Sequence, residues 1–346
     1  MFGGSVQWFI PNAFLIPYSS FLIPHSSFPL LPYLRSRMLL PSSVTVTLKQ
    51  RYSGHTAGVF ALAEGLDEAT FLSGGGDGVI AQWKMDGSAD ATGIARVPGN
   101  IFSLLPLPDR HLILAGDLHG GLHSIDTRTR TEVNRFAWDG GAVYAIERLS
   151  DTHVALCSGT GNLVIRNVQT HTTEQVIAVS SQSLRGISTD KTRRHLAIAS
   201  SDHAVHILDA ATFKTDHILK QHTNSVFCVR WSPDGKWLLS GSRDAQLMIW
   251  NAETLQLEQQ IPAHMFTIND IQFSPDGRLF ATAGRDKHIK IWDAETFTLL
   301  KVLDVEKYDG HRNSVNKLFW STSTNTLISC GDDRMVMRWE IHRLVD

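Results

Sequence analysis

The chain contains 346 residues, of which 42% are hydrophobic, and its formal net charge is −2 at pH 7. This length and composition suffice for a substantial core, and the near-neutral charge gives no general attraction to nucleic acid or to an anionic membrane. Three scattered cysteines without a CxxC pair argue against a disulfide framework and a zinc site. They suit a reducing compartment, so we expect a cytoplasmic protein without nucleic-acid or membrane partners; the cysteines are Cys157, Cys228 and Cys330.

Residues 1–43 differ in composition from the rest of the chain. Residues 1–34 contain no Asp, Glu, Lys or Arg, and the heptad at 14–20 recurs at 21–27 with one change. A signal peptide needs a positive start and an unbroken apolar stretch, whereas here prolines interrupt every candidate helix. We interpret 1–43 as a leader outside the fold, from an over-extended start with Met38 as the natural initiator. The alternatives are a disordered extension and an export signal or membrane anchor.

A repeat of about 42 residues fills the chain from residue 44 onward. Seven equivalent positions follow one another at intervals of 42, 41, 42, 42, 42 and 47 residues. The extra residues of the last interval lie in VEKYDG (305–310), which we interpret as a loop insertion. We number the copies 1 to 7 by these positions, which are Trp83, Ile125, Arg166, Leu208, Trp250, Trp292 and Trp339.

Four copies share a set of four residues at constant intervals of 18, 4 and 6 positions. We call each set a tetrad. The tetrads are His55, Ser73, Asp77 and Trp83 in copy 1; His222, Ser240, Asp244 and Trp250 in copy 5; His264, Thr282, Asp286 and Trp292 in copy 6; and His311, Ser329, Asp333 and Trp339 in copy 7.

Each copy also divides into four strand-like segments. In copy 5 these are 225–231, 236–242, 245–251 and 255–261, and Ser-Pro-Asp-Gly at 232–235 is typical of a type I turn. No segment keeps a 3.6-residue apolar period long enough for a major helix. Four strands in about 42 residues are typical of one propeller blade.

These features resemble the WD40 repeat family over residues 44–346. Gly54-His55, Gly310-His311 and Trp292-Asp293 carry its signature, and Trp250-Asn251 and Trp339-Glu340 match it more loosely. The resemblance implies an all-β, seven-bladed propeller with four antiparallel strands per blade. Copies 2, 3 and 4 depart from the pattern: they have Ile125, Arg166 and Leu208 at the tryptophan position and His119, Thr160 and Asp202 at the aspartate position.

The resemblance also implies a structural role for the tetrads. In copy 5, Asp244 would accept hydrogen bonds from His222 and from backbone donors, and His222 would meet Ser240 and the Trp250 indole. A His-Ser-Asp set could instead form a hydrolase triad, but a catalytic set occurs once and the tetrad occurs four times.

We therefore expect no catalytic residues, and we expect no metal or cofactor either. The glycine-rich stretch 73–79 lacks the Lys-Ser/Thr pair of a phosphate-binding loop and aligns with a turn in copy 5. His119, His123 and Cys157 are too dispersed to form a metal site.

The two ends of the repeat region predict how the ring closes. Copy 7 has only seven residues after Trp339, so it lacks a fourth strand, whereas 44–50 has strand composition and no copy of its own. A ring without free edges needs its first and last blades joined. We therefore expect 44–50 to supply the outer strand of the last blade.

The resemblance implies a non-catalytic scaffold or adaptor, monomeric on its own, that binds a protein or peptide at the mouth of its channel. Fold alone does not settle function. A propeller enzyme or ligand-binding protein acting at the mouth of the channel is the alternative, although we find no non-periodic cluster of titratable residues for it.

The predicted binding residues come from two columns, a column being the set of residues at one equivalent position in successive copies. In similar proteins both face the channel opening: one lies in the innermost strands and the other directly before the turn aspartates. Exposed aromatics with nearby arginines are typical of binding hot spots and would favour an acidic or phosphorylated peptide. The aromatics could equally be packed between blades. The predicted residues are Phe60, Phe102, Tyr144, Arg185, Phe227, Asn269 and Asn316 from the first column and Arg243, Arg285 and Asp332 from the second.

Overall fold

The computed structural model describes residues 43–88 and 90–344. The chain divides into two units, Met1–Leu40 and Pro41–Asp346, and all the described residues belong to the second. The leader predicted at 1–43, including Met38, therefore lies outside the described residues except for its last position.

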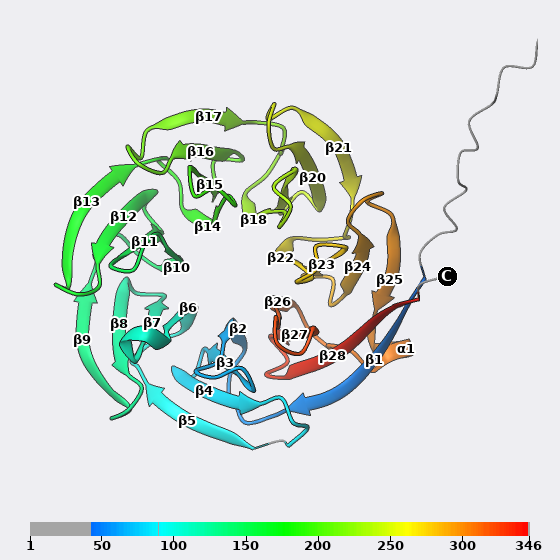
Figure 1. Ribbon diagram of the computed structural model, residues 1–346, viewed down its shortest axis with the longest axis horizontal. Helices are drawn as coiled ribbons and strands as arrows, with labels where there is room; N and C mark the ends of the chain where they lie inside the picture. Colours follow the sequence, from blue (N-terminus) through cyan, green and yellow to red (C-terminus); the bar gives the residue numbers. More distant parts are fainter. Residues whose placement is uncertain (1–42, 89, 345–346) are drawn as a thin grey trace, which may run out of the picture. The chain divides into compact units, whose positions relative to one another are not determined.

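Seven antiparallel sheets of four strands each form the blades of a propeller around a central channel (Figure 1). This confirms the predicted all-β, seven-bladed fold. Blades 1 to 6 each consist of four consecutive strands with the first strand innermost, and blade numbers follow the sequence copies.

Blades 1 to 3 come first along the chain. Blade 1 contains β2 (Val59–Glu64), β3 (Thr70–Gly75), β4 (Val79–Lys84) and β5 (Ala91–Arg96). Blade 2 contains β6 (Ile101–Leu107), β7 (Leu112–Asp117), β8 (Gly121–Asp126) and β9 (Thr131–Ala137), with a 3-10 turn at Pro108–Arg110. Blade 3 contains β10 (Val143–Arg148), β11 (His153–Ser158), β12 (Asn162–Asn167) and β13 (Thr172–Ala178).

Blades 4 to 6 follow with the same order. Blade 4 contains β14 (Leu184–Thr189), β15 (His195–Ser200), β16 (Val205–Asp209) and β17 (Thr215–Leu219). Blade 5 contains β18 (Val226–Trp231), β19 (Trp237–Ser242), β20 (Gln246–Asn251) and β21 (Leu257–Pro262), within two residues of the segments predicted from the sequence. Blade 6 contains β22 (Ile268–Phe273), β23 (Leu279–Gly284), β24 (Ile289–Asp293) and β25 (Leu299–Leu303).

Blade 7 combines the two ends of the described chain. It contains β26 (Val315–Trp320), β27 (Thr326–Gly331) and β28 (Val336–Leu344), and its outer strand is β1 (Ser43–Tyr52). β1 pairs antiparallel with β28 from Ser43 opposite Leu344 to Tyr52 opposite Val336. The predicted closure is confirmed, and the strand extends two residues beyond the predicted end at Gln50.

The insertion before blade 7 contains one helical turn, α1 (Val305–Tyr308), where the sequence predicted a loop. The Asp304 carboxylate caps it by accepting a hydrogen bond from the Lys307 N–H at 2.7 Å. No helix in the described part of the chain is long and apolar enough to cross a membrane.

The hydrophobic core lies between neighbouring blades. Every cluster of buried apolar side chains joins two adjacent blades, so that Trp83 and Phe71 of blade 1 pack with Ile328 of blade 7. The central strands are consequently covered on both faces, and all six residues of β23 are buried. The outer strands are exposed, as in β9, because nothing stacks beyond them. This stacking fixes the innermost strands around the channel.

Candidate partner-binding site at the channel mouth

The innermost strand of every blade has a β-bulge at the first predicted column. In blade 1 the pairing of β2 with β3 shifts between Val59 and Ala61, so that Phe60 has no residue opposite it. The same shift occurs at the matching position of the other six blades. A bulge inserts one extra residue and redirects its side chain. The bulge residues are Phe60, Phe102, Tyr144, Arg185, Phe227, Asn269 and Asn316.

All seven bulge residues line one cavity of about 250 Å³, together with Lys317 and Asp332. We call it the mouth cavity. All seven are half-buried, so the blades neither bury them completely nor leave them fully exposed. Arg243 and Arg285 are exposed and do not line this cavity. The binding role of Arg243 and Arg285 stays a prediction, whereas Asp332, at the matching turn position of blade 7, does line the cavity. Lys317, next to Asn316, was missed.

The five bulge residues of blades 1 to 5 form a continuous row of four rings and one guanidinium group around one side of the mouth cavity. Phe60 stacks on Phe102 with ring centroids 4.9 Å apart, and Phe102 meets Tyr144 edge-on at 5.7 Å. The Arg185 guanidinium lies 4.3 Å from the Tyr144 ring centroid and 5.2 Å from that of Phe227. We call these five residues the aromatic arc.

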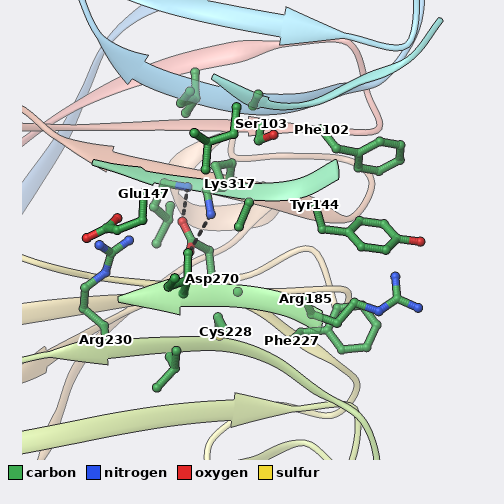
Figure 2. Close-up of a pocket in the computed structure, with 18 of the residues that line it drawn as sticks. Phe102, Ser103, Tyr144, Glu147, Arg185, Phe227, Cys228, Arg230, Asp270 and Lys317 are labelled. Carbon is green, nitrogen blue, oxygen red and sulfur yellow. Dashed lines mark hydrogen bonds and ion pairs between the residues drawn. The ribbon is translucent and has the colours of Figure 1, made fainter. Parts of the chain in front are cut away.

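The Arg185 guanidinium is held in place from three sides. Besides the two rings, its Nε donates to the Ser201 hydroxyl at 3.0 Å. Within residues 43–88 and 90–344, its two terminal nitrogens have no hydrogen-bond partner. Figure 2 shows the guanidinium and the Tyr144 hydroxyl pointing to the same side, away from Asp270 and Lys317. The site therefore presents an ordered cation whose donors are free to bind an anion.

The two asparagines opposite the aromatic arc bond to neighbouring blades. Asn269 Nδ2 donates to the Ser314 hydroxyl at 3.0 Å and to the Val315 carbonyl at 2.8 Å. Asn316 Nδ2 donates to the Val59 carbonyl at 3.0 Å and to the Asp332 carboxylate at 2.7 Å. These amides link blade 6 to blade 7 and blade 7 to blade 1, so their Nδ2 donors are already bonded within the protein.

A second cavity of about 150 Å³ continues into the channel (Figure 2). The residues that it shares with the mouth cavity are Phe102, Tyr144, Arg185, Phe227 and Lys317. Asp270, which is 2% exposed, accepts from Lys317 Nζ at 3.1 Å and from the Leu318 N–H at 3.0 Å.

Glu147 and Arg230 also line this second cavity. Glu147 accepts from the Thr189 hydroxyl at 2.7 Å, and Arg230 Nε donates to the Ile271 carbonyl at 3.4 Å. The sequence predicts no non-periodic cluster of titratable groups, but Glu147, Arg230, Asp270 and Lys317 form one here. Only the register of the innermost strands brings these residues together.

The tetrads are hydrogen-bonded within single repeats, away from the mouth cavity. In blade 5, His222 Nδ1 lies 3.0 Å from Asp244 Oδ2, and His222 Nε2 lies 2.8 Å from the Ser240 hydroxyl. The Trp250 indole N–H donates to the Ser240 hydroxyl at 3.0 Å, and not to His222 as the resemblance implied. A proton on His222 Nδ1 and an acceptor lone pair on Nε2 satisfy every one of these bonds. The tetrads of blades 1, 6 and 7 have the same contacts.

Hydrogen bonding keeps the tetrad aspartates ionised. Burial alone would raise the pKa of Asp286, but bonds from His264 and from the Met265 and His288 N–H groups outweigh it and lower the pKa to about 2. Asp244 has the same pattern and also a pKa of about 2. Burial lowers the pKa of His264 despite the neighbouring Asp286.

Blade 2 replaces the tetrad with a different buried network. His123 Nε2 lies 3.0 Å from Asp117 Oδ2, and its Nδ1 lies 2.6 Å from Glu132 Oε1. Asp117 and His123 are completely buried, and the Asp117 carboxylate also accepts from the His119 and Gly121 N–H groups, both at 2.7 Å. This histidine comes from β8 instead of a loop, so the tetrad spacing does not predict it.

Blades 3 and 4 have further substitutes. In blade 3, Arg166 takes the tryptophan position, and its guanidinium lies 3.7 Å from the Phe136 ring centroid. In blade 4, Asp202 accepts from the Ser180 hydroxyl at 2.8 Å and lies 2.8 Å from His206 Nε2. In the described ranges 43–88 and 90–344, no group of three or more His, Cys, Asp or Glu residues could hold a metal ion.

Comparison with known proteins identifies the repeat. The family model "WD domain, G-beta repeat" (WD40) matches residues 46–84, 213–251, 255–293 and 303–340, which end at or beside the tetrad tryptophans. The matched repeats are offset from the blades, so that residues 46–84 join β1 of blade 7 to β2–β4 of blade 1. The chain therefore carries four WD40 repeats and is a WD40 propeller. It resembles the crystal structure of the WD40 β-propeller domain of Doa1 with a TM-score of 0.75 and 17% identity, covering 85% of this chain and 97% of that one. This likeness concerns the fold. No curated protein matches the chain.

Proposed function

We propose that this WD40 propeller is a non-catalytic scaffold that binds a protein or peptide partner at the mouth cavity. The aromatic arc would recognise an acidic or phosphorylated segment through Arg185. WD40 propellers commonly serve as scaffolds for protein contacts, and the arc adds a reason specific to this chain. The single observation that carries the proposal is the ordered Arg185 guanidinium, which lies between two rings with both terminal nitrogens free.

An ordered guanidinium favours binding in two ways. Its terminal nitrogens can donate two parallel bonds to one carboxylate or phosphate, which are among the stronger hydrogen bonds in proteins. Its side chain is already immobilised by Tyr144, Phe227 and Ser201, so little further rotamer entropy is lost on binding. Phe60 and Phe102 supply apolar area beside the anion, as in binding hot spots.

The test is the substitution Arg185→Gln in the full chain. We expect loss of binding to phosphorylated peptides on an array, with a melting temperature close to that of the parent. The matched control is Arg278→Gln, because Arg278 is an exposed arginine of a turn outside the mouth cavity. Equal peptide binding by the parent and Arg185→Gln would contradict the proposal.

The second candidate is a ligand-binding protein or enzyme that uses the channel. The observation in its favour is the cluster of Glu147, Arg230, Asp270 and Lys317 along the second cavity. Each of these groups already has a protein partner, which weakens this alternative. A small ligand whose binding is lost in Glu147→Gln but kept in Arg185→Gln would favour the channel over the mouth, because Glu147 lines only the second cavity.

We also propose that the protein acts in the cytoplasm as a monomer. The three cysteines are free and buried, and burial raises the pKa of each thiol, which keeps it protonated and unreactive. Fractionation of cells and gel filtration of the purified chain test the location and the monomeric state.

A further inference from the structure

Two adjacent apolar side chains are exposed on the loop between β21 and β22. Met265 is 77% exposed and Phe266 is 58% exposed. In the three other WD40 repeats the same two loop positions are Thr56-Ala57, Thr223-Asn224 and Arg312-Asn313. Blade 6 is therefore the only tetrad-bearing blade with two large apolar residues at these positions.

The fold does not require these side chains. The structural task of the loop is performed by the Met265 N–H, which donates to Asp286 Oδ2 at 3.0 Å. Thr56, Thr223 and Arg312 donate through their backbone N–H groups in the same way, at 2.8, 2.9 and 2.9 Å. Because threonine and arginine serve equally well, the apolar character of Met265 and Phe266 has no structural explanation in the tetrad.

Two arginine-bearing turns hold this loop from either side. The Ala263 and His264 N–H groups donate to the Ala245 carbonyl at 3.1 and 3.3 Å, which ties the loop to the turn that carries Arg243. The bond from Met265 to Asp286 ties it to the turn that carries Arg285. Both arginines are exposed, and neither side chain makes a hydrogen bond or ion pair with any residue of the described ranges.

We propose that Met265, Phe266, Arg243 and Arg285 form a second docking surface, separate from the mouth cavity. We call these four residues the loop patch. Its occupant is a partner segment in which an apolar side chain is flanked by carboxylates. The apolar pair would bury that side chain, and the unpaired guanidinium groups on both sides would pair with the carboxylates. A basic segment would be repelled, since the exposed Lys287 adds a third cation beside Arg285.

The test is selection of peptides from a random displayed library on the full chain. We expect the selected peptides to combine acidic residues with a central apolar residue. The double substitution Met265→Thr with Phe266→Asn should weaken their binding at least tenfold, measured by fluorescence anisotropy with the labelled peptides. Arg243→Ser with Arg285→Ser should weaken binding and also reduce its dependence on salt.

The controls separate the loop patch from the mouth cavity. Met265→Thr with Phe266→Asn installs the loop residues of blade 5, Thr223 and Asn224, which hold the same geometry, so the melting temperature should not change. If it does, the single change Phe266→Ser replaces the double one. Arg185→Gln should leave binding of these peptides unchanged.

Three results would overturn this inference. They are peptides that are neutral or basic, peptides that bind the loop variants as tightly as the parent, and failure to select any peptide. Peptides that lose binding only in Arg185→Gln would support the mouth cavity and refute the loop patch.

Discussion

At the residue scale, the tetrad shows how a polar set can be buried at little cost. The side chains of His264, Thr282, Asp286 and Trp292 bond to one another, and the ionised carboxylate accepts from two backbone N–H groups as well as from the histidine. Removing one member would leave the others buried and unsatisfied, which costs more than the net gain of a typical hydrogen bond.

The first residue-scale prediction concerns Asp286. Asp286→Ala leaves His264 and two backbone donors without their acceptor, so the free energy of unfolding should fall by about 1–3 kcal/mol. Thr160→Ala is the matched control in blade 3, since Thr160 is exposed and bonds only to neighbours in its own turn. It should change stability by less than about 0.5 kcal/mol. Urea unfolding measures both, and equal losses at the two positions would refute the assignment.

The second residue-scale prediction is a loss of stability in acid. Asp244 and Asp286 have pKa values of about 2 in the folded chain, below the value of about 3.9 expected after unfolding. Their contribution is fully present above pH 4 and is lost as the pH falls from about 4 to 2.

His264 acts in the same direction at higher pH. Its folded pKa is lowered, so below about pH 6.5 the unfolded state binds the proton more readily. Thermal melting between pH 7 and pH 2 should show a falling midpoint, and below about pH 4 the fall should be shallower in Asp286→Ala because that carboxylate is absent. A constant midpoint from pH 6 to pH 3 would contradict this account.

At the element scale, β1 joins the two ends of the described chain and also connects blade 7 to blade 1. Its last residue, Tyr52, is completely buried against Phe71 and Trp83 of blade 1, and its hydroxyl donates to the Lys84 carbonyl at 2.9 Å. The strand therefore contributes both a row of backbone hydrogen bonds and a share of the core between two blades.

The element-scale prediction is that deletion of residues 43–52 causes aggregation. The deletion leaves the edge of β28 unpaired, and an open strand edge can pair with other molecules. Tyr52→Ala is the milder variant and should cost about 3–5 kcal/mol, as for other large aromatic residues in cores. Thr47→Ala is the control on the same strand because Thr47 is exposed. A monomeric elution profile and unchanged melting after the deletion would argue against closure by β1.

At the scale of the whole propeller, the ring brings side chains from distant repeats together around the mouth cavity. The aromatic arc takes one residue from each of five blades, and the Asp270–Lys317 pair joins blade 6 to blade 7. Since each contact crosses a boundary between blades, the mouth cavity depends on the closed ring, and loss of β1 should disturb binding as well as stability.

Several features of this propeller follow from the sequence alone. The spacing of His55, Ser73, Asp77 and Trp83 and its recurrence define the blades, because each blade is a local unit whose tetrad bonds stay within one repeat. The segment at 44–50 predicted the closure. It has strand composition but no copy of its own, and copy 7 lacks a fourth strand, so pairing the two completes the ring. The first column of bulge residues was also predicted, because it recurs with the same period.

Other features were decided only by the packing of blades about 42 residues apart. The β-bulges set which side chains enter the mouth cavity, and this placed Arg185 between Tyr144 and Phe227 but left Arg243 and Arg285 outside it. Asp117 and His123 form a hydrogen-bonded pair where other blades have a tetrad, and His123 lies on a strand instead of a loop. The Asp270 carboxylate accepts from Lys317 across the boundary between blades 6 and 7. A spacing rule detects contacts that repeat within one blade, whereas these contacts depend on the register between strands and on the faces of neighbouring sheets, which exist only once the ring is assembled.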